Sequence, residues 1–558
     1  MVISPLQKKI FYILSSILLV ILLIVITALV SITVYFNNNF KEKIQTEVYK
    51  QTKGEYELKI KKLSVNVFNQ SFRLNECSLT PDKSIKPDNA KYKVTVKQIN
   101  LKDFGLWGFL IKKKLDLDNL EMVEPVVNIY RNIPVKQKTK TDSSEKISIY
   151  TILKKFISEI SIDKICITNA SVHVFDHMSD KQNLLTSNSN ELFITHFKIN
   201  KISDEQNKLF IADVLKLTVN NFIYHSAKNL NTLYIKKITA SYNDSILILD
   251  SFQLKPNYNK HVYAKKVGHQ TDRITIHTLE STFHNIDISS LFEKNILIAK
   301  HLNVKNFNIE IYRDKNDPPL EIKYAKSLQQ KLKTIPILMN INKITLKNSK
   351  VVYEEVAKDA DKAGSISFDQ LNGTVTGLTS NPVLYGCKKL DVQATALFMN
   401  TGKLKARFTF PLTTDEMVFV CYGKLGEMDL KVLNKILTPN AHLVIKDGIA
   451  DSALISFHAD NSGALGTLKI GYHHLKINLL KKDNGKGFYS GFLSLLYRIL
   501  FIKEENPTRK KDIRIAEINY KRDPKHFIFK YTWMSILSGI KPTIGIPHAR
   551  SKKKPKEN

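Results

Sequence analysis

The sequence is poor in cysteine, with four in 558 residues. Cys77, Cys166, Cys387 and Cys421 lie far apart, and none of the intervals between them is that of a metal-binding pair. The spacing therefore gives no support to a cysteine metal site. We expect all four to be small buried residues, and a disulfide between any two of them stays open.

Recognisable catalytic motifs are also lacking. The chain has no Gly-rich phosphate-binding loop, no nucleophile elbow and no His-Glu-x-x-His site. His473 and His474 lie within an alternating run, so we expect the two imidazoles on opposite faces of a strand. Asp116 and Asp118 share one strand face; a solvated face is the preferred interpretation, and paired acids are the alternative. We predict a protein that is not an enzyme and holds no metal or cofactor.

Acidic residues are scarce beside basic ones, with 52 Asp and Glu against 84 Lys and Arg and a formal net charge of +32. Such an excess favours nucleic acid, anionic lipid or another polyanion as a neighbour. The lysines stand mostly singly at the polar positions of strands, as in Leu215-Lys216-Leu217, which is typical of a solvated outer face. We prefer that interpretation and keep an anionic envelope polymer as an open alternative partner.

One long hydrophobic run is present, at residues 10–36. It carries no charge and exceeds the ~20 residues that a helix needs to cross a bilayer. It is too long for a cleaved signal peptide. Lys8 and Lys9 precede it, so the positive-inside tendency places residues 1–9 in the cytoplasm. We predict an uncleaved single-pass anchor in the inner membrane with the bulk of the chain in the periplasm, a topology that argues against nucleic acid as partner.

A short pattern recurs in the rest of the chain, represented by Leu302–Arg313. Two apolar residues stand two apart, and a second such pair begins seven residues after the first, which indicates two short strands meeting at a polar kink. The other copies begin with Leu120/Met122 and Val127/Ile129, with Ile165/Ile167 and Val172/Val174, and with Ile344/Leu346 and Val351/Tyr353. The order of parts around these copies predicts a tandem duplication of roughly 180 residues, and convergent strand patterning is the alternative.

Regular short strands with Gly and Asn turns continue to the C-terminus and indicate antiparallel β structure. They include expected strands at Ile513–Tyr520 and Phe527–Tyr531. The expected segments are a linking helix at 37–59, a first repeat at 60–180, connecting strands at 181–234, a second repeat at 235–359, a C-terminal β region at 360–486, an apolar helix with terminal strands at 487–541, and a basic disordered tail at 542–558.

Taken together, these parts resemble the AsmA-like family of anchored envelope proteins of Gram-negative bacteria, which is related to TamB and to bridge-like lipid transfer proteins. The resemblance rests on the anchor, on the strand pairs ending at Tyr130-Arg131 and Tyr312-Arg313, on Gly423–Asp429, and on the β-rich C-terminal third. It implies a mainly β protein, in which a transmembrane helix precedes a long twisted antiparallel sheet curled into an open groove, with a few short amphipathic helices. From the residues alone, two stacked sheets in a sandwich are the stronger expectation.

The resemblance further implies that the apolar concave face holds phospholipid acyl chains, without catalytic residues, and serves outer-membrane lipid homeostasis. The candidate groove residues are Val94, Val96, Leu215, Leu217, Val219, Ile309, Ile311, Leu404, Phe408, Phe410, Leu468 and Ile470. A short apolar helix is expected to enter a membrane leaflet, to close the end of the groove or to be buried in the core; its candidates are Phe492, Leu495, Leu496, Ile499 and Leu500.

The alternative function is an anchored periplasmic scaffold for envelope assembly. In that case the C-terminal edge strands bind the outer membrane or an outer-membrane protein by β-augmentation.

Overall fold

The computed structural model describes residues 40–52, 54–66, 70–81, 91–105, 112–131, 158–176, 183–206, 210–319, 324–335, 337–358, 360–480, 502–507 and 512–545. Within these ranges there are 21 strands and a few short helices, and the strands belong to one hydrogen-bonded sheet. The expectation of a mainly β protein with short helices is confirmed, and a single sheet takes the place of the two stacked sheets of a sandwich. The predicted anchor at 10–36 lies outside the described residues; among those described, no helix combines the length and the apolar character needed to cross a membrane.

The chain forms two compact units. Unit 1 comprises Met1–Gln253 and Thr282–Asn295, and unit 2 comprises Leu254–Ser281 and Ile296–Asn558. The border at residue 253 falls inside the segment 235–359 that the sequence assigns to a second repeat. Compact units and predicted repeats therefore do not coincide, and the duplication stays a prediction.

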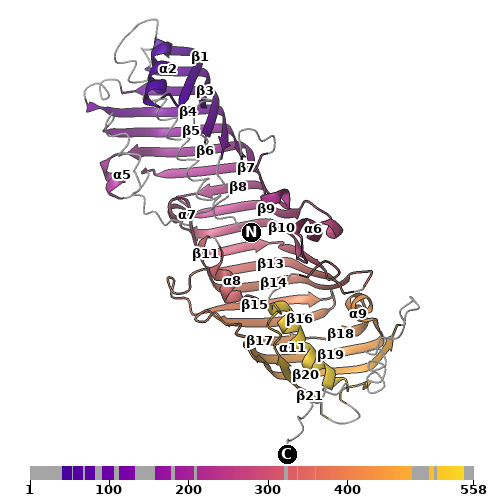
Figure 1. Cartoon of the computed structure of the whole chain (residues 1–558). Coiled ribbons are helices and arrows are strands. Elements are labelled where there is room, and N and C mark those ends of the chain that lie inside the picture. Colours follow the sequence, from indigo (N-terminus) through magenta and orange to yellow (C-terminus); the bar gives the residue numbers. More distant parts are fainter. Residues whose placement is uncertain are drawn as a thin grey trace, which may run out of the picture. The chain divides into compact units, whose positions relative to one another are not determined.

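The first described element of unit 1 is helix α2, which lies within the segment 37–59 predicted as a linking helix, although β1 already starts at Tyr56 inside that segment. The strands that come after it follow one another in the order of the chain (Figure 1). Its elements are α2 Phe40–Gln51, β1 Tyr56–Asn66, β2 Ser71–Pro81, β3 Lys91–Phe104, β4 Lys114–Tyr130, β5 Glu159–Phe175, β6 Leu185–Ile199, α5 Lys201–Glu205, β7 Val214–His225, η1 Ala227–Asn229, β8 Asn231–Ser241 and α7 Ile288–Lys294. Strands β9 (Ile246–Pro256) and β10 (Arg273–Ile286) contribute residues to both units.

Unit 2 contains the remaining strands, with two helices, α8 and α11, on one of its sheet faces (Figure 1). Its elements are α6 Lys260–Val267, β11 Ile296–Lys305, β12 Asn308–Asp314, α8 Leu328–Lys333, β13 Leu338–Val356, β14 Gly364–Thr379, β15 Lys389–Phe398, β16 Gly402–Pro411, β17 Phe419–Leu425, β18 Met428–Asp429, η2 Leu430–Leu433, α9 Asn434–Ala441, β19 Leu443–Ala459, β20 Gly463–Leu479, β21 Ile515–Lys521 and α11 Ile528–Thr543.

The sheet is mixed, so the expectation of an antiparallel sheet is wrong in part. In unit 1, β4 pairs with β5 in parallel, and in unit 2 both β11 and β12 pair in parallel with β13. Parallel neighbours need a crossover of a dozen or more residues. The sequence separates β4 from β5, and β12 from β13, by connections long enough for such a crossover.

These parallel pairs are built from the recurring pattern. Leu120 lies opposite Ile165 in unit 1, and Leu302 lies opposite Ile344 in unit 2. An odd spacing of seven would put the second apolar pair on the wrong face of a regular strand, because side chains alternate with period two. One extra residue in a left-handed conformation restores the face, as in a β-bulge. That residue stands four positions after the first apolar one in every copy: Glu124 (φ 53°), Asn169 (φ 59°), Asn306 (φ 54°) and Asn348 (φ 49°).

Candidate functional site

The apolar face of unit 1 is largely a packed core. Val94 and Val96 on β3 are buried there among the aliphatic residues of the neighbouring strands. Leu215, Leu217 and Val219 on β7 are half-buried, and two of them, Leu215 and Val219, pack against that core. The predicted groove residues Val94 and Val96 therefore contact protein side chains, and the three predicted groove residues on β7 are more accessible.

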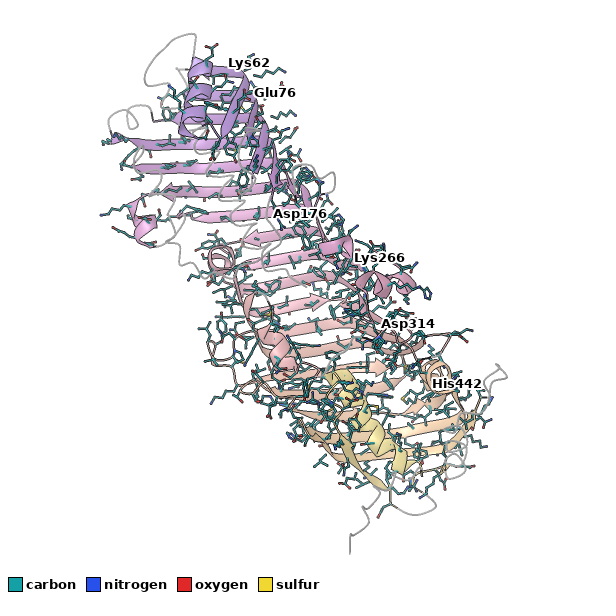
Figure 2. The ribbon with its side chains drawn as sticks, in the orientation of Figure 1. Lys62, Glu76, Asp176, Lys266, Asp314 and His442 are labelled. Carbon is teal, nitrogen blue, oxygen red and sulfur yellow. The ribbon has the colours of Figure 1, made fainter. Side chains whose placement is uncertain are left out.

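On the polar face of unit 1, two lysines have acidic partners on the neighbouring strand. Lys61 on β1 pairs with Glu76 on β2 at 2.6 Å, and Lys97 on β3 pairs with Glu124 on β4 at 2.5 Å. Figure 2 shows Glu76 and the nearby Lys62 among the charged side chains of these strands. Exposed pairs of this kind contribute little to stability, roughly 0–1 kcal/mol. Each of these two lysines therefore has an acidic partner.

Helices cover one part of the apolar face of unit 2. Phe410 on β16 and Leu468 on β20 are buried in a cluster with Leu332 of α8 and Tyr531 of α11. Phe408 and Ile470 are half-buried and pack against the same cluster, with the Phe408 ring 6.3 Å from that of Phe410. These four predicted groove residues come together, and they contact protein side chains.

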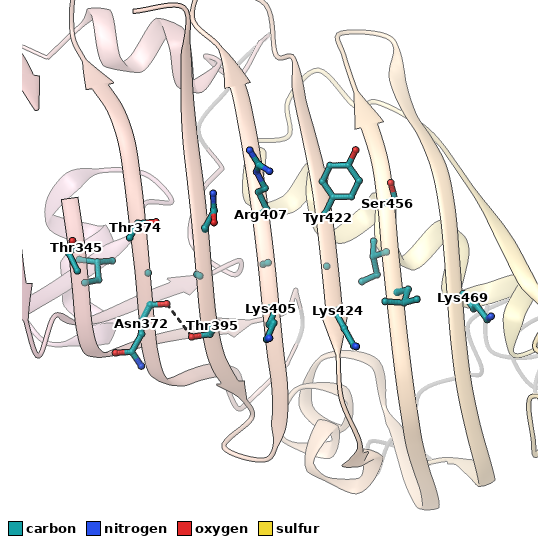
Figure 3. Close-up of a pocket in the computed structure, with 18 of the residues that line it drawn as sticks. Thr345, Asn372, Thr374, Thr395, Lys405, Arg407, Tyr422, Lys424, Ser456 and Lys469 are labelled. Atoms are coloured by element: carbon teal, nitrogen blue, oxygen red, sulfur yellow. Dashed lines mark hydrogen bonds between the residues drawn. The ribbon is translucent and has the colours of Figure 1, made fainter. Parts of the chain in front are cut away.

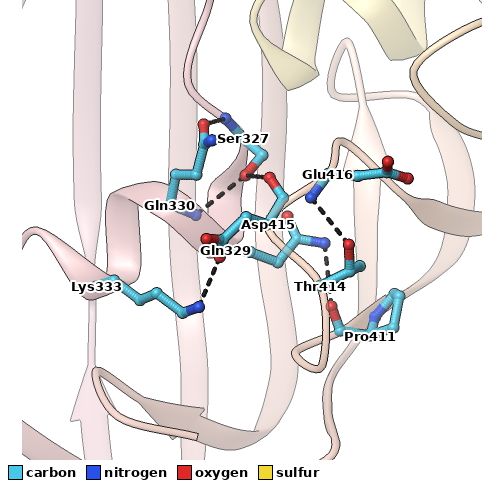
Figure 4. Close-up of polar contacts among 8 residues, drawn as sticks. All are labelled: Ser327, Gln329, Gln330, Lys333, Pro411, Thr414, Asp415 and Glu416. Carbon is cyan, nitrogen blue, oxygen red and sulfur yellow. Dashed lines mark hydrogen bonds and ion pairs between the residues drawn. The ribbon is translucent and has the colours of Figure 1, made fainter.

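Helix α8 is fixed to the loop between β16 and β17 by specific polar contacts (Figure 4). The Ser327 hydroxyl donates to the carbonyl of Asp415 at 2.8 Å, and the Lys333 ammonium lies 2.6 Å from the Asp415 carboxylate. The buried Gln329 amide donates to the carbonyls of Pro411 and Val418 at 3.1 and 3.0 Å. Ser327 also caps the helix, as its hydroxyl oxygen accepts from the backbone N–H of Gln330. Buried hydrogen bonds of this kind hold the short helix in one position.

Helix α11 corrects the expectation of a strand at Phe527–Tyr531. The helix starts at Ile528, and its buried residues are Tyr531, Ser535, Gly539 and Thr543, one per turn. Small residues at 535 and 539 allow close approach: a Cβ at 539 would lie 3.0 Å from the Leu468 Cβ. The helix therefore packs tightly over β20 and β21.

A band of aliphatic side chains in unit 2 remains accessible. Ile309 and Ile311 on β12, Ile344 on β13 and Leu404 on β16 are half-buried, and they lie outside the cluster beneath α8 and α11. Ile309 and Ile311 have neighbours of the same kind, because their register places them opposite Val351 and Tyr353. Three of these four were predicted groove residues.

Charged residues border this band where β12 ends. The Arg313 guanidinium donates to the Asp272 carboxylate at 2.7 Å, and the Tyr353 hydroxyl donates to Glu355 at 2.7 Å. Burial raises the pKa of the Tyr353 phenol, and the Glu355 carboxylate adds to the rise. The apolar row at Ile309 and Ile311 therefore has a polar, hydrogen-bonded boundary on its C-terminal side.

The opposite face of unit 2 carries a hollow of about 1060 Å³ that crosses β13 to β17 and β19 to β21. Two rows of side chains border it, with Arg407 and Tyr422 in one row and Lys405 and Lys424 in the other (Figure 3). Both rows alternate along their strands with the residues of the apolar face. For lone lysines at such strand positions the sequence predicts a solvated outer face, and it does not predict a hollow.

Asp391 on β15 binds the arginine of this hollow. The Arg407 guanidinium donates to both oxygens of the Asp391 carboxylate, at 3.0 and 3.1 Å, and the Thr409 hydroxyl donates at 2.7 Å. Burial alone would raise the pKa of Asp391, but the hydrogen bonds from Arg407, Thr409 and Gln393 outweigh it and lower the pKa to about 2. The charge of Arg407 is thereby matched within the protein.

Asp391→Asn is expected to lower the free energy of unfolding by about 2 kcal/mol at neutral pH. Because the folded pKa of about 2 lies below the unfolded value of ~3.9, this contribution is complete above about pH 4 and is lost as the pH falls towards about 2. Urea unfolding of the wild type and the variant at a series of pH values measures it. A difference that stays constant down to pH ~2.5 would show that ionisation of Asp391 is not its source.

The two adjacent histidines depart from the expectation of opposite faces. The rings of His473 and His474 lie 4.8 Å apart, because His474 has a left-handed backbone (φ 56°) that turns the strand locally. His473 Nδ1 pairs with Asp451 at 2.9 Å. Asp116 and Asp118 are both exposed on β4. Within the described ranges, no group of three or more His, Cys, Asp or Glu is placed to hold a metal ion.

All four cysteines are free thiols. Cys77 and Cys421 are buried as expected, and burial raises the pKa of each to about 12. Cys166 and Cys387 are half-buried. The candidates for the groove end, Phe492, Leu495, Leu496, Ile499 and Leu500, lie outside the described residues, as does most of the predicted tail.

No protein-family model matches the chain, and no curated protein matches it in sequence. The functional assignment therefore rests on the residues and their geometry.

Proposed function

We propose that this chain is a non-catalytic protein, anchored in the inner membrane by residues 10–36, that carries phospholipid acyl chains through the periplasm on its apolar sheet face. The observation that supports it is the half-buried aliphatic band of unit 2, formed by Ile309, Ile311, Ile344 and Leu404. In unit 1, Leu215, Leu217 and Val219 form a comparable half-buried row. The proposed role is lipid homeostasis of the outer membrane.

The energetics fit such a role. Moving an acyl chain through water costs about 0.8 kcal/mol per exposed CH₂. Ten methylenes therefore face roughly 8 kcal/mol, which a continuous apolar surface removes. Contacts of this kind are non-directional, so the proposed carrier distinguishes poorly between acyl chains.

Ile309→Glu is expected to reduce the bound phospholipid. With a carboxylate in the row, at least two lipid methylenes lose their apolar contact. The loss costs ~1.6 kcal/mol of binding free energy and weakens lipid binding roughly tenfold. Asn308→Glu is the matched control, because it adds the same charge to the adjacent, exposed position of β12. Lipid extracted from the purified full chain and counted by mass spectrometry gives the occupancy.

Three results would decide against the proposal. They are the absence of phospholipid from the wild-type protein, equal lipid content in Ile309→Glu and the wild type, and equal loss in Ile309→Glu and Asn308→Glu. Circular dichroism of both variants must match the wild type, so that a loss of lipid reports on the face and not on unfolding.

The second candidate function is the scaffold for envelope assembly. It is favoured by β21, which among the described strands pairs only with β20 and so presents a free edge for β-augmentation. The two functions separate experimentally. A scaffold retains its partner protein in Ile309→Glu and loses it when a proline at Asn519 removes a backbone donor from β21.

A further inference from the structure

The hollow on the polar face of unit 2 has an unbalanced set of charges. Its lining residues include five basic side chains, Lys347, Lys405, Arg407, Lys424 and Lys469, and no Asp or Glu. Arg407 is matched by Asp391. No ion pair to the four lysines is found within the described ranges, in contrast to Lys61 and Lys97 in unit 1. The hollow therefore presents four unmatched positive charges.

Two of these charges face each other directly. The register places Lys405 on β16 opposite Lys424 on β17, and both are exposed. Like charges at directly opposite positions destabilise a sheet. Lys469 stands two strands further along the same row, beyond Leu454. An anion lying along this row would relieve the repulsion and contact three lysines at once.

The row also exposes large apolar side chains. Leu454 stands between Lys424 and Lys469 and is 48% exposed, and Ile515 follows Lys469 and is 63% exposed. Tyr422 in the facing row is 52% exposed. Purely ionic ligands such as polyphosphate make no use of such surfaces, whereas the CH-rich faces of sugar rings do.

Eight other lining residues supply neutral hydrogen-bonding groups. They are Thr345, Asn348, Asn372, Thr374, Gln393, Thr395, Ser456 and Thr467. The hollow crosses eight strands, and seven spacings of ~4.8 Å correspond to roughly 34 Å. It is therefore elongated across the strands, which suits an extended chain.

We infer that this hollow is a binding site for a linear acidic glycan, a chain of sugars that carry carboxylate, phosphate or sulfate groups. The anionic groups contact Lys405, Lys424 and Lys469, the sugar rings pack on Tyr422 and Leu454, and hydroxyls bond to the Asn, Thr and Ser side chains. The site lies on the face opposite the aliphatic band, so it does not depend on the lipid-carrying function.

The test uses the full chain in mild detergent and alginate, a linear polymer of carboxylated sugars, as the probe. The variant Lys405→Gln/Lys424→Gln/Lys469→Gln removes the three contacts. The control Lys93→Gln/Lys102→Gln/Lys216→Gln removes three exposed lysines from unit 1 strands and changes the net charge equally. With three contacts, a fourfold rise in salt should weaken wild-type binding roughly 20-fold, and the first variant should lose this dependence while the control keeps it.

Further arms identify the ligand chemistry. Tyr422→Ala should weaken alginate severalfold without changing the salt dependence, and neutral dextran should not bind. Equal loss in both triple variants would assign binding to net charge and overturn the site. Equal or tighter binding of polyphosphate, or binding to phosphatidylglycerol vesicles without alginate binding, would overturn a glycan ligand. Phospholipid content should be unchanged in the first variant, so failure of this proposal leaves the lipid proposal standing, and the reverse.

Discussion

Tyr531→Ala is expected to lower the free energy of unfolding of unit 2 by about 3–5 kcal/mol, the range for removal of a buried aromatic ring. Tyr531 is fully buried, and its ring meets Phe419 edge to face with centroids 5.6 Å apart. Its hydroxyl donates to the carbonyl of Asp460 at 2.8 Å. Truncation leaves a cavity beneath α11 and an acceptor without its donor, so both packing and hydrogen bonding are lost.

Tyr531→Phe separates the loss of packing from the loss of the hydrogen bond. It keeps the ring and removes only the hydrogen bond, so the expected loss is about 1 kcal/mol. The chain has two tryptophans, Trp107 and Trp533, and the second lies in α11. In a Trp107→Phe background, the fluorescence of Trp533 during urea unfolding reports on this helix. Equal midpoints for Tyr531→Ala and Tyr531→Phe would show that α11 is not held by the ring.

Detachment of α11 has a functional consequence under the proposed lipid-carrying role. Leu468 would lose the helix that packs on it and would join the accessible side chains near Leu404. An exposed apolar patch is a site at which lipid or another protein binds. A helix that covers part of an apolar face thus limits how much of that face is open to ligand.

The same helix shows where the sequence was insufficient. The alternation in Phe527–Tyr531 resembles a strand, and the buried stripe of α11 consists partly of Ser535, Gly539 and Thr543, which carry no hydrophobic signal. Close packing of small residues becomes visible only once the facing strands are placed. The paired-strand pattern was more informative, because the polar kink predicted between its two apolar pairs is where the structure has the left-handed residue Asn306 and its equivalents.

The unbalanced hollow was not predictable for a different reason. Lys405, Lys424 and Lys469 are far apart in the sequence, and they share a row only because β17 pairs with β19 and β19 with β20. Composition gave the positive excess but not its location. By contrast, the half-buried state of Ile309 and Leu404 has two causes, the alternation of their strands and the positions of α8 and α11. The alternation can be read from the sequence, but the helix positions cannot.

Gly466→Ala is expected to destabilise unit 2 by about 3 kcal/mol or more, since overpacking against backbone leaves no side chain to move aside. Gly466 on β20 lies opposite Phe457 on β19. A Cβ at 466 would lie 2.1 Å from the carbonyl oxygen of Ser456 and 2.5 Å from the Cα of Phe457. The two strands would have to separate, and Phe457 would be displaced from the cluster beneath α11.

Gly423→Ala is the matched comparison on β17, which pairs with β19 on the side away from β20. A Cβ there would lie 3.5 Å from the Cδ1 of Ile455, an ordinary contact. Alanine also costs less conformational entropy in a strand than glycine, so this variant should be neutral or more stable by ~0.5–1 kcal/mol. Urea unfolding followed at Trp533 measures both. If Gly466→Ala proved as stable as Gly423→Ala, β19 and β20 would have to lie further apart at Gly466 than in this structure. The cluster under α11 would then not depend on the close approach of these two strands.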